Sequence, residues 1–320
     1  MTNVTLILSK GLADKVRSRY YEQLAKDFPQ LKITVVDTAP AALPLMPETD
    51  ILMSYAPQCK GHDMLKDAPR VKWIQSFTTG MDGIIDQPNL KKNVVVTSMK
   101  GIHGAPVSEA AISGMLALSR HLSDTVKFQQ QHSWQRVVPT LLNGKTAGIF
   151  GIGVIGEALA PRLKALGMRV VGISATKRPV PGFDDMFSRD ELVRAVKDLD
   201  HFVLLTPYTP ETHHIVGKQV LAAMKPGSFL INVARGGIVD EEALMHALKN
   251  GPLAAAALDV FSMEPLPANH PLWDMPNVFV TPHTGGVHVD YADDALPIVE
   301  ENMRRFLAGD LKNMVNVVEH

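Results

Sequence analysis

The chain has 320 residues, a length that predicts two domains, and its 46% hydrophobic and 20% charged residues are typical of a globular protein. A net charge of −1, and no apolar run long enough to span a bilayer, argue against nucleic-acid and membrane partners. The one cysteine, Cys59, excludes an intrachain disulfide and a cysteine-rich zinc site, and favours a reducing cytoplasm.

Strand-like and helix-like segments alternate over the first hundred residues. Apolar runs predict strands at 4–8, 33–37, 50–53, 72–76 and 93–98. Helical spacing predicts a helix at 12–27, and this alternation favours parallel α/β layers. The segments 56–62 and 76–84 follow predicted strands, so we expect loops there, where α/β sheets bind their ligands.

A helical segment with small residues along one face covers 105–122, so we expect close packing against it. Residues 123–145 are polar but include Trp134, which is either a core anchor or an interface residue. A strand, a glycine turn, a helix and a strand follow at 145–174.

The rest of the chain continues this alternation. Further strands are predicted at 200–207, 228–234, 252–261 and 277–283, and an amphipathic helix at 294–310. Because the alternation begins near residue 4 and again near residue 146, we predict an α/β protein with two doubly wound parallel-sheet lobes.

Gly151, Gly153 and Gly156 form the pattern G-x-G-x-x-G between a predicted strand and a predicted helix, which is the context that dinucleotide binding requires. Gly151 allows a tight turn, Gly153 lets the backbone approach a pyrophosphate, and Gly156 allows close helix–strand contact. The helix N-terminus, which includes Val154 and Ile155, offers unpaired N–H groups and partial positive charge. We therefore predict a dinucleotide cofactor.

The second strand of this lobe ends in the residues that distinguish the two nicotinamide cofactors. An acidic residue here would bind the ribose hydroxyls of NAD(H) and repel a phosphate. The sequence has Ser174, Thr176, Lys177 and Arg178 instead, which suit the roughly −1.5 to −2 charge of a phosphate. We expect NADP(H) to be preferred, with NAD(H) as the alternative. A solvated basic loop with relaxed cofactor choice is the other interpretation.

Arg235, Glu264 and His283 each follow a predicted strand of the second lobe. The carboxyl ends of parallel strands lie on one edge of a sheet, where the glycine turn also lies, so the three side chains could converge beside a nicotinamide. Taken singly, each is more simply a surface or structural residue. Their matching positions indicate a catalytic site.

Four segments, FGIGVIG, INVARGGIVDEEAL, ALDVFSMEPLP and TPHTGG, occur in the order of the D-isomer-specific 2-hydroxyacid dehydrogenases, and the chain resembles that family over nearly its whole length. The basic strand end is similar to the NADPH-dependent glyoxylate/hydroxypyruvate reductase branch. The resemblance implies a Rossmann-type cofactor lobe at 101–287, a discontinuous flavodoxin-like substrate lobe at 1–100 and 288–320, and a cleft between them. It also implies a homodimer in which a residue near Trp134 reaches the partner's site.

The resemblance also carries roles over to single residues. Arg235 would bind the substrate carboxylate and keto oxygen, which suits its bidentate geometry. His283 would protonate the nascent alkoxide, and Glu264 would favour the protonated form of His283. Thr79 and Gly80 would offer backbone N–H groups to the carboxylate. No metal is expected, because Arg235 and His283 meet the developing oxyanion.

Asp259 would meet the nicotinamide amide. The other implied cofactor contacts are Thr206, Pro207, Thr212, Val233, Ala234 and Gly285. Side chains that either shape the substrate pocket or belong to the core are Tyr55, Met81, Met99 and Trp134.

The expected reaction is reduction of a small glyoxylate- or hydroxypyruvate-like 2-keto acid to the D-2-hydroxy acid. Lactate-like acids, phosphoglycerate and phosphite are alternative substrates, whereas formate oxidation would need no Glu264–His283 proton relay. We expect no regulatory domain after the last helix, which disfavours a feedback-controlled phosphoglycerate enzyme. An NAD(P)H-sensing scaffold without turnover is the alternative from another class, and the three catalytic residues argue against it.

Overall fold

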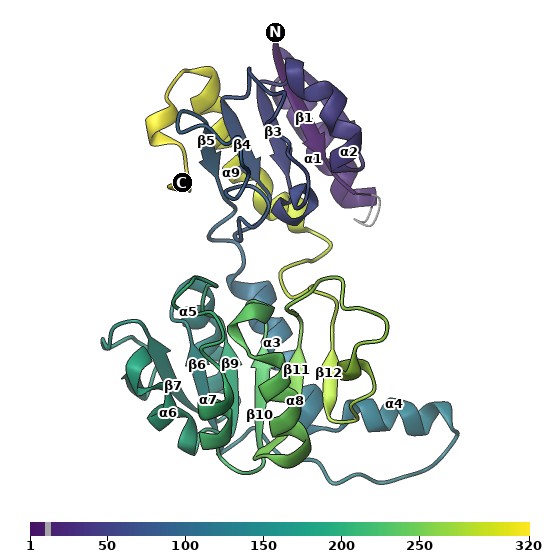
Figure 1. Cartoon of the computed structure of the whole chain (residues 1–320), viewed down its shortest axis with the longest axis vertical. Coiled ribbons are helices and arrows are strands. Elements are labelled where there is room, and N and C mark those ends of the chain that lie inside the picture. Colours follow the sequence, from purple (N-terminus) through teal and green to yellow (C-terminus); the bar gives the residue numbers. More distant parts are fainter. Residues whose placement is uncertain (10–13) are drawn as a thin grey trace. The chain divides into compact units, whose positions relative to one another are not determined.

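The structure, a computed structural model, describes residues 1–9 and 14–320 and contains two compact units (Figure 1). Unit 1 comprises Met1–Ile102 and His288–His320, and unit 2 comprises His103–Val287. Each unit is built around a wholly parallel sheet covered by helices, so the prediction of two parallel-sheet α/β lobes is confirmed. Among the described residues, no helix is both long and apolar enough to cross a membrane.

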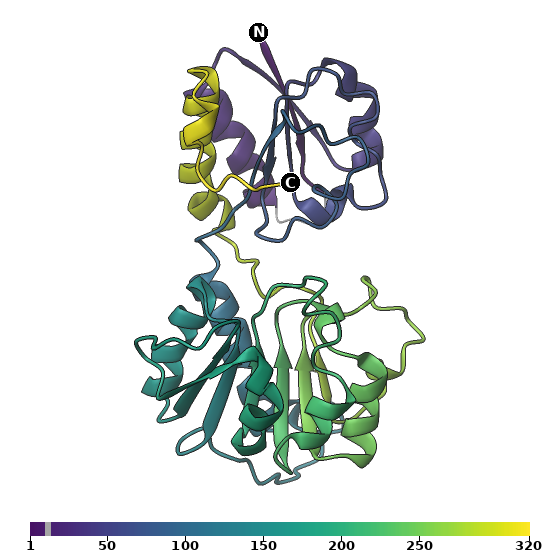
Figure 2. The same cartoon turned by 60° about the vertical axis from the view of Figure 1, so that its left-hand side comes forward.

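Unit 1 has a five-stranded sheet in the order β2-β1-β3-β4-β5. The strands are β1 (Thr2–Ile7), β2 (Leu31–Val36), β3 (Ile51–Ser54), β4 (Trp73–Ser76) and β5 (Val95–Thr97). The helices α1 (Asp14–Asp27) and α9 (Tyr291–Leu307) lie side by side on one face, and α2 (Ala39–Ala42) and short 3-10 turns cover the other (Figure 2). The helix predicted at 12–27 is confirmed from residue 14, and its first two residues lie outside the described ranges.

Both faces of this sheet are covered, so its strands need apolar residues at successive positions. All four residues of β3 and all four of β4 are buried. Consecutive apolar residues, such as 51–53 in β3, are what predicted the strands, although Gln75 and Ser76 at the end of β4 are buried polar residues. The last helix of the chain packs with α1 on the sheet formed by the first hundred residues, so the two ends of the chain share one core.

Unit 2 has a seven-stranded sheet in the order β12-β11-β10-β9-β6-β7-β8. The strands are β6 (Thr146–Phe150), β7 (Arg169–Ser174), β8 (Asp185–Ser188), β9 (His201–Leu204), β10 (Ser228–Asn232), β11 (Leu253–Leu258) and β12 (Val278–Val280). The chain order reverses between β6 and β9, the type of position where open α/β sheets bind ligands. The glycine turn follows β6 and therefore lies at this reversal.

The helices of unit 2 form two layers. The helices α3 (Gly104–Ser119) and α5 (Val154–Ala165) share a core on one face, and α6 (Leu192–Ala195), α7 (Lys218–Ala223) and α8 (Glu241–Asn250) cover the other. The close packing expected along 105–122 is present, because a Cβ atom added at Gly114 would lie 2.9 Å from the Cβ of Ala257.

The region 123–145 differs from its prediction, because it begins with a further helix, α4 (Leu122–Gln130). None of the residues of α4 is buried, so the helix has no core-facing stripe that the sequence pattern could reveal. The side chain of Trp134 is 92% exposed in this chain, so the core-anchor interpretation is wrong, and the interface interpretation stays a prediction.

Candidate active site

The glycine turn joins β6 to α5 and has the geometry of a dinucleotide cradle. Gly151 has φ +106°, and an added Cβ would lie 2.4 Å from the backbone nitrogen of Thr206. A Cβ at Gly156 would lie 2.7 Å from the carbonyl oxygen of Gly151. A Cβ at Gly153 meets no protein atom within 4 Å, so packing inside the protein does not require this glycine. Close approach of a ligand does require it, and a dinucleotide therefore fits the turn.

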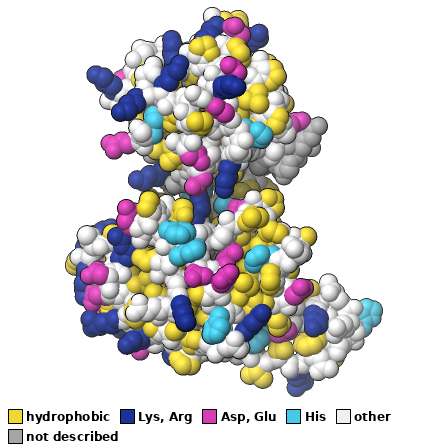
Figure 3. Space-filling view, in the orientation of Figure 1, with side chains coloured by type: hydrophobic (Ala, Val, Ile, Leu, Met, Phe, Trp, Pro, Cys, Tyr) yellow, Lys and Arg dark blue, Asp and Glu magenta, His cyan; other side chains and the backbone are white. Residues whose placement is uncertain are grey.

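The end of β7 presents hydroxyl and basic side chains to solvent. The Ser174 hydroxyl donates to the Thr176 carbonyl oxygen at 2.7 Å, which curls the loop back on itself. The Lys177 ammonium lies 5.7 Å from the centre of the Phe187 ring, and the Arg178 guanidinium lies 3.8 Å from the Glu157 carboxylate. Lys and Arg side chains gather along this edge of unit 2 in Figure 3. The cations are therefore placed at the strand end that distinguishes NADP(H) from NAD(H).

The loop after β9 is a compact turn beside the glycine turn. Thr206 is buried against Gly151, and the Thr212 hydroxyl, also buried, donates to the Pro207 carbonyl oxygen at 2.8 Å. The same hydroxyl accepts from the Thr209 N–H at 2.8 Å. Thr212 thus holds the loop together, Thr206 lies against the glycine turn, and Pro207 is exposed.

Arg235 follows β10 in a short turn that packs against the loop after β11. Its guanidinium donates to the Ala234 carbonyl oxygen at 2.7 Å, and the Asn232 amide donates to the Arg235 carbonyl oxygen at 3.1 Å. A Cβ at Gly236 would lie 1.9 Å from the Phe261 carbonyl carbon, so only glycine allows this approach. Gly236 therefore places Arg235 beside the loop that contains Glu264.

Glu264 and His283 form a direct pair, with His283 Nδ1 and a Glu264 carboxylate oxygen 2.6 Å apart. The other Glu264 oxygen accepts from the Phe261 N–H at 2.9 Å. Burial raises the pKa of Glu264, but the hydrogen bonds from His283 and Phe261 and the charges of His283 and Arg235 lower it below its ordinary value. An ionised carboxylate only accepts, so Nδ1 carries the proton and Nε2 is left to exchange one.

Asp259 fixes the backbone that presents His283. Its side chain is buried, and one carboxylate oxygen accepts from the Thr281 hydroxyl at 2.5 Å and the Thr284 N–H at 3.0 Å. The other accepts from the Gly285 N–H at 2.8 Å, and the Asp259 carbonyl oxygen accepts from the His283 N–H at 2.8 Å. His283 itself has φ +53°, an uncommon value that this set of bonds maintains.

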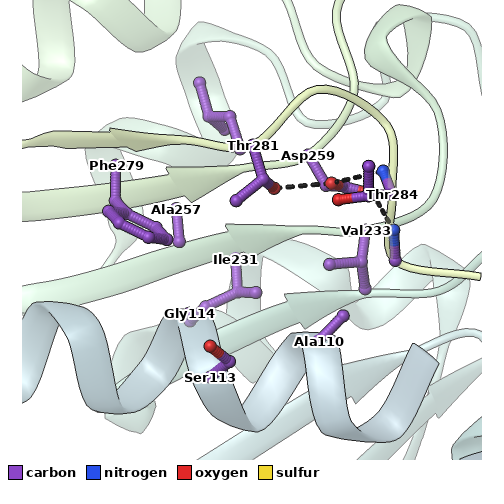
Figure 4. A pocket seen from close by; sticks show the side chains of 12 residues that line it. Ala110, Ser113, Gly114, Ile231, Val233, Ala257, Asp259, Phe279, Thr281 and Thr284 are labelled. Atoms are coloured by element: carbon purple, nitrogen blue, oxygen red, sulfur yellow. Dashed lines mark hydrogen bonds between the residues drawn. The ribbon is translucent and has the colours of Figure 1, made fainter. Parts of the chain in front are cut away.

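A cavity of about 150 Å³ lies between α3 and the strands β10 to β12 (Figure 4). Asp259, Thr281 and Thr284 lie together toward one end of it, and Phe279 and Ala257 lie at the other end. Apart from the Ser113 hydroxyl on α3, the side chains that line the remainder are apolar. The cofactor candidates Val233, Asp259 and Gly285 all line it. A carboxylate has about four acceptor sites. Asp259 uses three of them, which leaves room for one further donor such as an amide N–H.

In unit 1, the loop after β4 contains the predicted carboxylate donors. Thr79 is exposed and Gly80 is half-buried, and the Thr79 hydroxyl donates to the Met99 carbonyl oxygen at 3.4 Å. Tyr55, which follows β3, is half-buried, and burial raises its pKa to about 12, so its hydroxyl stays protonated. Met81 and Met99 are buried core residues, which is the simpler of their two interpretations.

Two features of the site were not predicted from the sequence. They are the hydrogen bond from the Thr281 hydroxyl to Asp259 and the close contact with Phe261 that requires glycine at position 236. The signal for Thr281 was present, because it precedes His283 by two positions directly after a strand.

The fold and these residues define the class of dinucleotide-dependent oxidoreductases built from two α/β units.

Comparisons with known proteins agree with this class. The family model for the D-isomer specific 2-hydroxyacid dehydrogenase NAD-binding domain matches residues 112–285. Glyoxylate reductase from Thermococcus litoralis is 32% identical over 279 residues, which cover 84% of each chain. The crystal structure of a D-isomer specific 2-hydroxyacid dehydrogenase family protein from Aeromonas salmonicida superposes with a TM-score of 0.87 at 32% identity over 99% of both chains.

The NADPH-dependent glyoxylate/hydroxypyruvate reductase from Sinorhizobium meliloti, solved in complex with NADP and sulfate, has a TM-score of 0.81 at 28% identity, and the match covers 100% of this chain and 98% of that one. The chain belongs to the D-isomer specific 2-hydroxyacid dehydrogenase family, as its motifs indicated, and contains that family's NAD-binding domain.

Proposed function

We propose that the protein reduces a small 2-keto acid of the glyoxylate or hydroxypyruvate type to the D-2-hydroxy acid, with NADPH as the reductant. The observation that carries this proposal is the 2.6 Å Glu264–His283 pair beside the Arg235 turn, on the unit that contains the glycine cradle. The names of two similar proteins, both glyoxylate reductases, support the substrate class.

When bound, the nicotinamide supplies the hydride, and the side chains of unit 2 handle charge and proton. His283 Nε2 donates the proton to the oxygen that becomes the alkoxide. Glu264 accepts from Nδ1, which keeps the ring oriented. Arg235 offers a bidentate, permanently charged donor to the substrate carboxylate and keto oxygen. Asp259 holds the His283 loop and accepts from the nicotinamide amide.

Unit 2 is the cofactor domain in this proposal, and unit 1 is the substrate domain. In unit 1, the backbone N–H groups of Thr79 and Gly80 bind the substrate carboxylate, and the protonated hydroxyl of Tyr55 is available as a further donor. In unit 2, the remaining cofactor contacts are Val154, Ile155, Thr206, Pro207, Thr212, Val233, Ala234 and Gly285.

NADPH is the preferred cofactor because cations and hydroxyls, rather than an acidic side chain, follow β7. Lys177 and Arg178 are both exposed at this strand end, and Ser174 is half-exposed beside them. A phosphate brings roughly −1.5 to −2 charges. Charge-assisted hydrogen bonds to these side chains would therefore bind the 2′-phosphate of NADPH and have no counterpart in NADH.

We also propose that the protein is a homodimer joined through the α4 region. Leu122 and Val126 on α4, and Trp134, Val138 and Leu141 after it, are all exposed large apolar residues of one segment. A second copy would bury them, and Trp134 would then lie near the partner's substrate. Sedimentation analysis of the parent and of Trp134→Ser tests this, and a parent that remains monomeric at micromolar concentration refutes it.

The function is tested by following NADPH and NADH oxidation with glyoxylate, hydroxypyruvate, pyruvate and phosphohydroxypyruvate. We expect the highest kcat/KM with glyoxylate or hydroxypyruvate and with NADPH. Turnover of only the phosphorylated acid would move the assignment to a phosphoglycerate-type enzyme. Tight NADPH binding without turnover of any acid would instead indicate a sensor.

A further inference from the structure

The loop of unit 1 that contains Thr79 and Gly80 begins with a buried aromatic residue. Phe77 is fully buried, whereas Thr79, two residues further on, is exposed. The Thr78 N–H donates to the Ser76 hydroxyl at 3.1 Å, and the Thr78 hydroxyl donates to the Gly80 carbonyl oxygen at 2.6 Å. The loop is therefore a short bridge between a buried anchor and the exposed Thr79 and half-buried Gly80.

The anchor is held by a residue from the other end of the chain. The Tyr291 hydroxyl, at the start of α9, donates to the Phe77 carbonyl oxygen at 2.5 Å across a separation of 214 residues. Burial raises the pKa of Tyr291 above its ordinary value, so the phenol stays protonated and remains a donor. The rings of Tyr20 and Tyr55 pack on Phe77 at 4.4 and 5.4 Å.

We propose that Tyr291 is a positioning residue that sets the direction of the Thr79 and Gly80 N–H groups for the substrate carboxylate. The Phe77 carbonyl and the Thr78 N–H belong to one planar peptide unit. Tyr291 fixes the oxygen of that unit and Ser76 fixes its nitrogen, so its rotation is restrained on both sides. The N–H groups of Thr79 and Gly80 belong to the next two peptide units, so the orientation of the first unit limits the directions in which they point. This inference rests on the proposed role of the loop in carboxylate binding.

The expected kinetic signature follows from the chemistry of the substrate. The carboxylate keeps its charge throughout hydride transfer, so its hydrogen bonds are the same in the ground and transition states. Loss of an interaction that stabilises the bound substrate and the transition state equally raises KM and leaves kcat unchanged. A general loss of packing would instead lower the melting temperature and the active fraction without a specific effect on KM for the acid.

The test compares Tyr291→Phe with Tyr20→Phe. Both substitutions remove one buried phenolic hydroxyl from the aromatic group around Phe77, but only Tyr291 donates to the Phe77 carbonyl. With the best acid of the panel, we expect Tyr291→Phe to raise KM about two- to tenfold, the range for one hydrogen bond. We expect kcat and the KM for NADPH to stay within about twofold, and Tyr20→Phe to leave all three constants unchanged.

Hydrogen exchange provides a readout that does not depend on turnover. In Tyr291→Phe, we expect amides in the segment 77–84 to exchange about two- to tenfold faster than in the parent and in Tyr20→Phe. Unchanged exchange together with an unchanged KM, or equal changes in both variants, would overturn the proposal. A parent that reduces no acid would refute the proposed function and the carboxylate role with it, while the exchange data would still decide whether Tyr291 holds the loop.

Discussion

Replacement of Glu264 by glutamine removes the negative charge from the pair with His283 and keeps the length of the side chain. The glutamine carbonyl can still accept from His283 Nδ1, so the ring keeps its orientation. Its amide group would then face the Phe261 N–H, which now contacts one of the two carboxylate oxygens at 2.9 Å. The ring therefore loses the anion beside it, and the hydrogen bond from the Phe261 N–H is lost as well.

The size of the effect follows from the hydrogen bond and its exposure. A hydrogen bond to a charged group contributes about 1.5–3 kcal/mol. The side chains of His283 and Glu264 are 38% and 33% exposed, so solvent screening reduces this contribution. We take the reduced value as about 1–1.5 kcal/mol. Such a free energy corresponds to about a five- to tenfold change in a rate constant.

The expected result is a loss of activity in the proton-transfer step. The Glu264 carboxylate lies 2.6 Å from His283 Nδ1, so it is the anion beside the ring that gives or takes the proton. In Glu264→Gln, we therefore expect kcat/KM for reduction of the keto acid to fall about five- to tenfold.

The assay is a pH profile of kcat/KM in both directions for the parent and the variant. Glu241→Gln is the matched control, because Glu241, at the start of α8, accepts at 2.7 Å from the N–H of Ser262 in the loop that contains Glu264. It makes the same change of charge without contact to His283, and we expect its profile to match that of the parent. If the Glu264→Gln profiles overlay the parent, the pair is not coupled and another residue supplies the proton.

Glu264 also predicts how stability depends on pH. Its pKa is lower in the folded protein than its ordinary value, so its charge stabilises the fold above about pH 4.3 and this contribution is lost as pH falls further. Glu264→Gln should therefore lose less stability than the parent between about pH 5 and pH 3 in urea unfolding. An equal loss in both proteins would show that the carboxylate is not stabilised by folding.

Three further substitutions test single contacts. Arg235→Lys keeps the charge but not the planar fork, so we expect kcat/KM to fall about ten- to a hundredfold, and a change within twofold would make Arg235 structural. Ser174→Asp puts an acid where a phosphate would bind, so the ratio of kcat/KM for NADPH over NADH should fall at least tenfold, and an unchanged ratio would place the 2′-phosphate elsewhere. Asp259→Asn leaves one oxygen for three donors, so we expect a melting temperature about 2–8 °C lower and a lower kcat, and wild-type values for both would refute its role as a clamp.

Much of the fold could be predicted because its signals are local. The apolar runs of β3 and β6 and the helical spacing of 105–122 reflect burial over a few consecutive residues. The glycine turn is recognisable because a strand and a helix flank it directly. Elements with a weak local signal were missed. The helices α6 and α7 have four and six residues, too few to show a helical period, and α4 has no buried face.

The helix α8 was also missed, although its signal was present. Asp240 caps it by accepting from the Ala243 N–H at 3.0 Å, and acidic residues occupy its first turn. Attention to capping residues, rather than to apolar runs alone, would have found it.

The sequence by itself determined the family, the parallel α/β architecture and the residue types available for hydride and proton chemistry, because these follow from short motifs and local periodicity. Only the tertiary structure decided which groups touch. The Gly236 contact that places Arg235 beside the Glu264 loop, the Asp259 bonds that hold His283, and the Tyr291 bond to Phe77 all join residues far apart in the chain. Such contacts depend on how the helix and sheet layers pack against each other, and the spacing of residues along one strand or helix does not predict that packing.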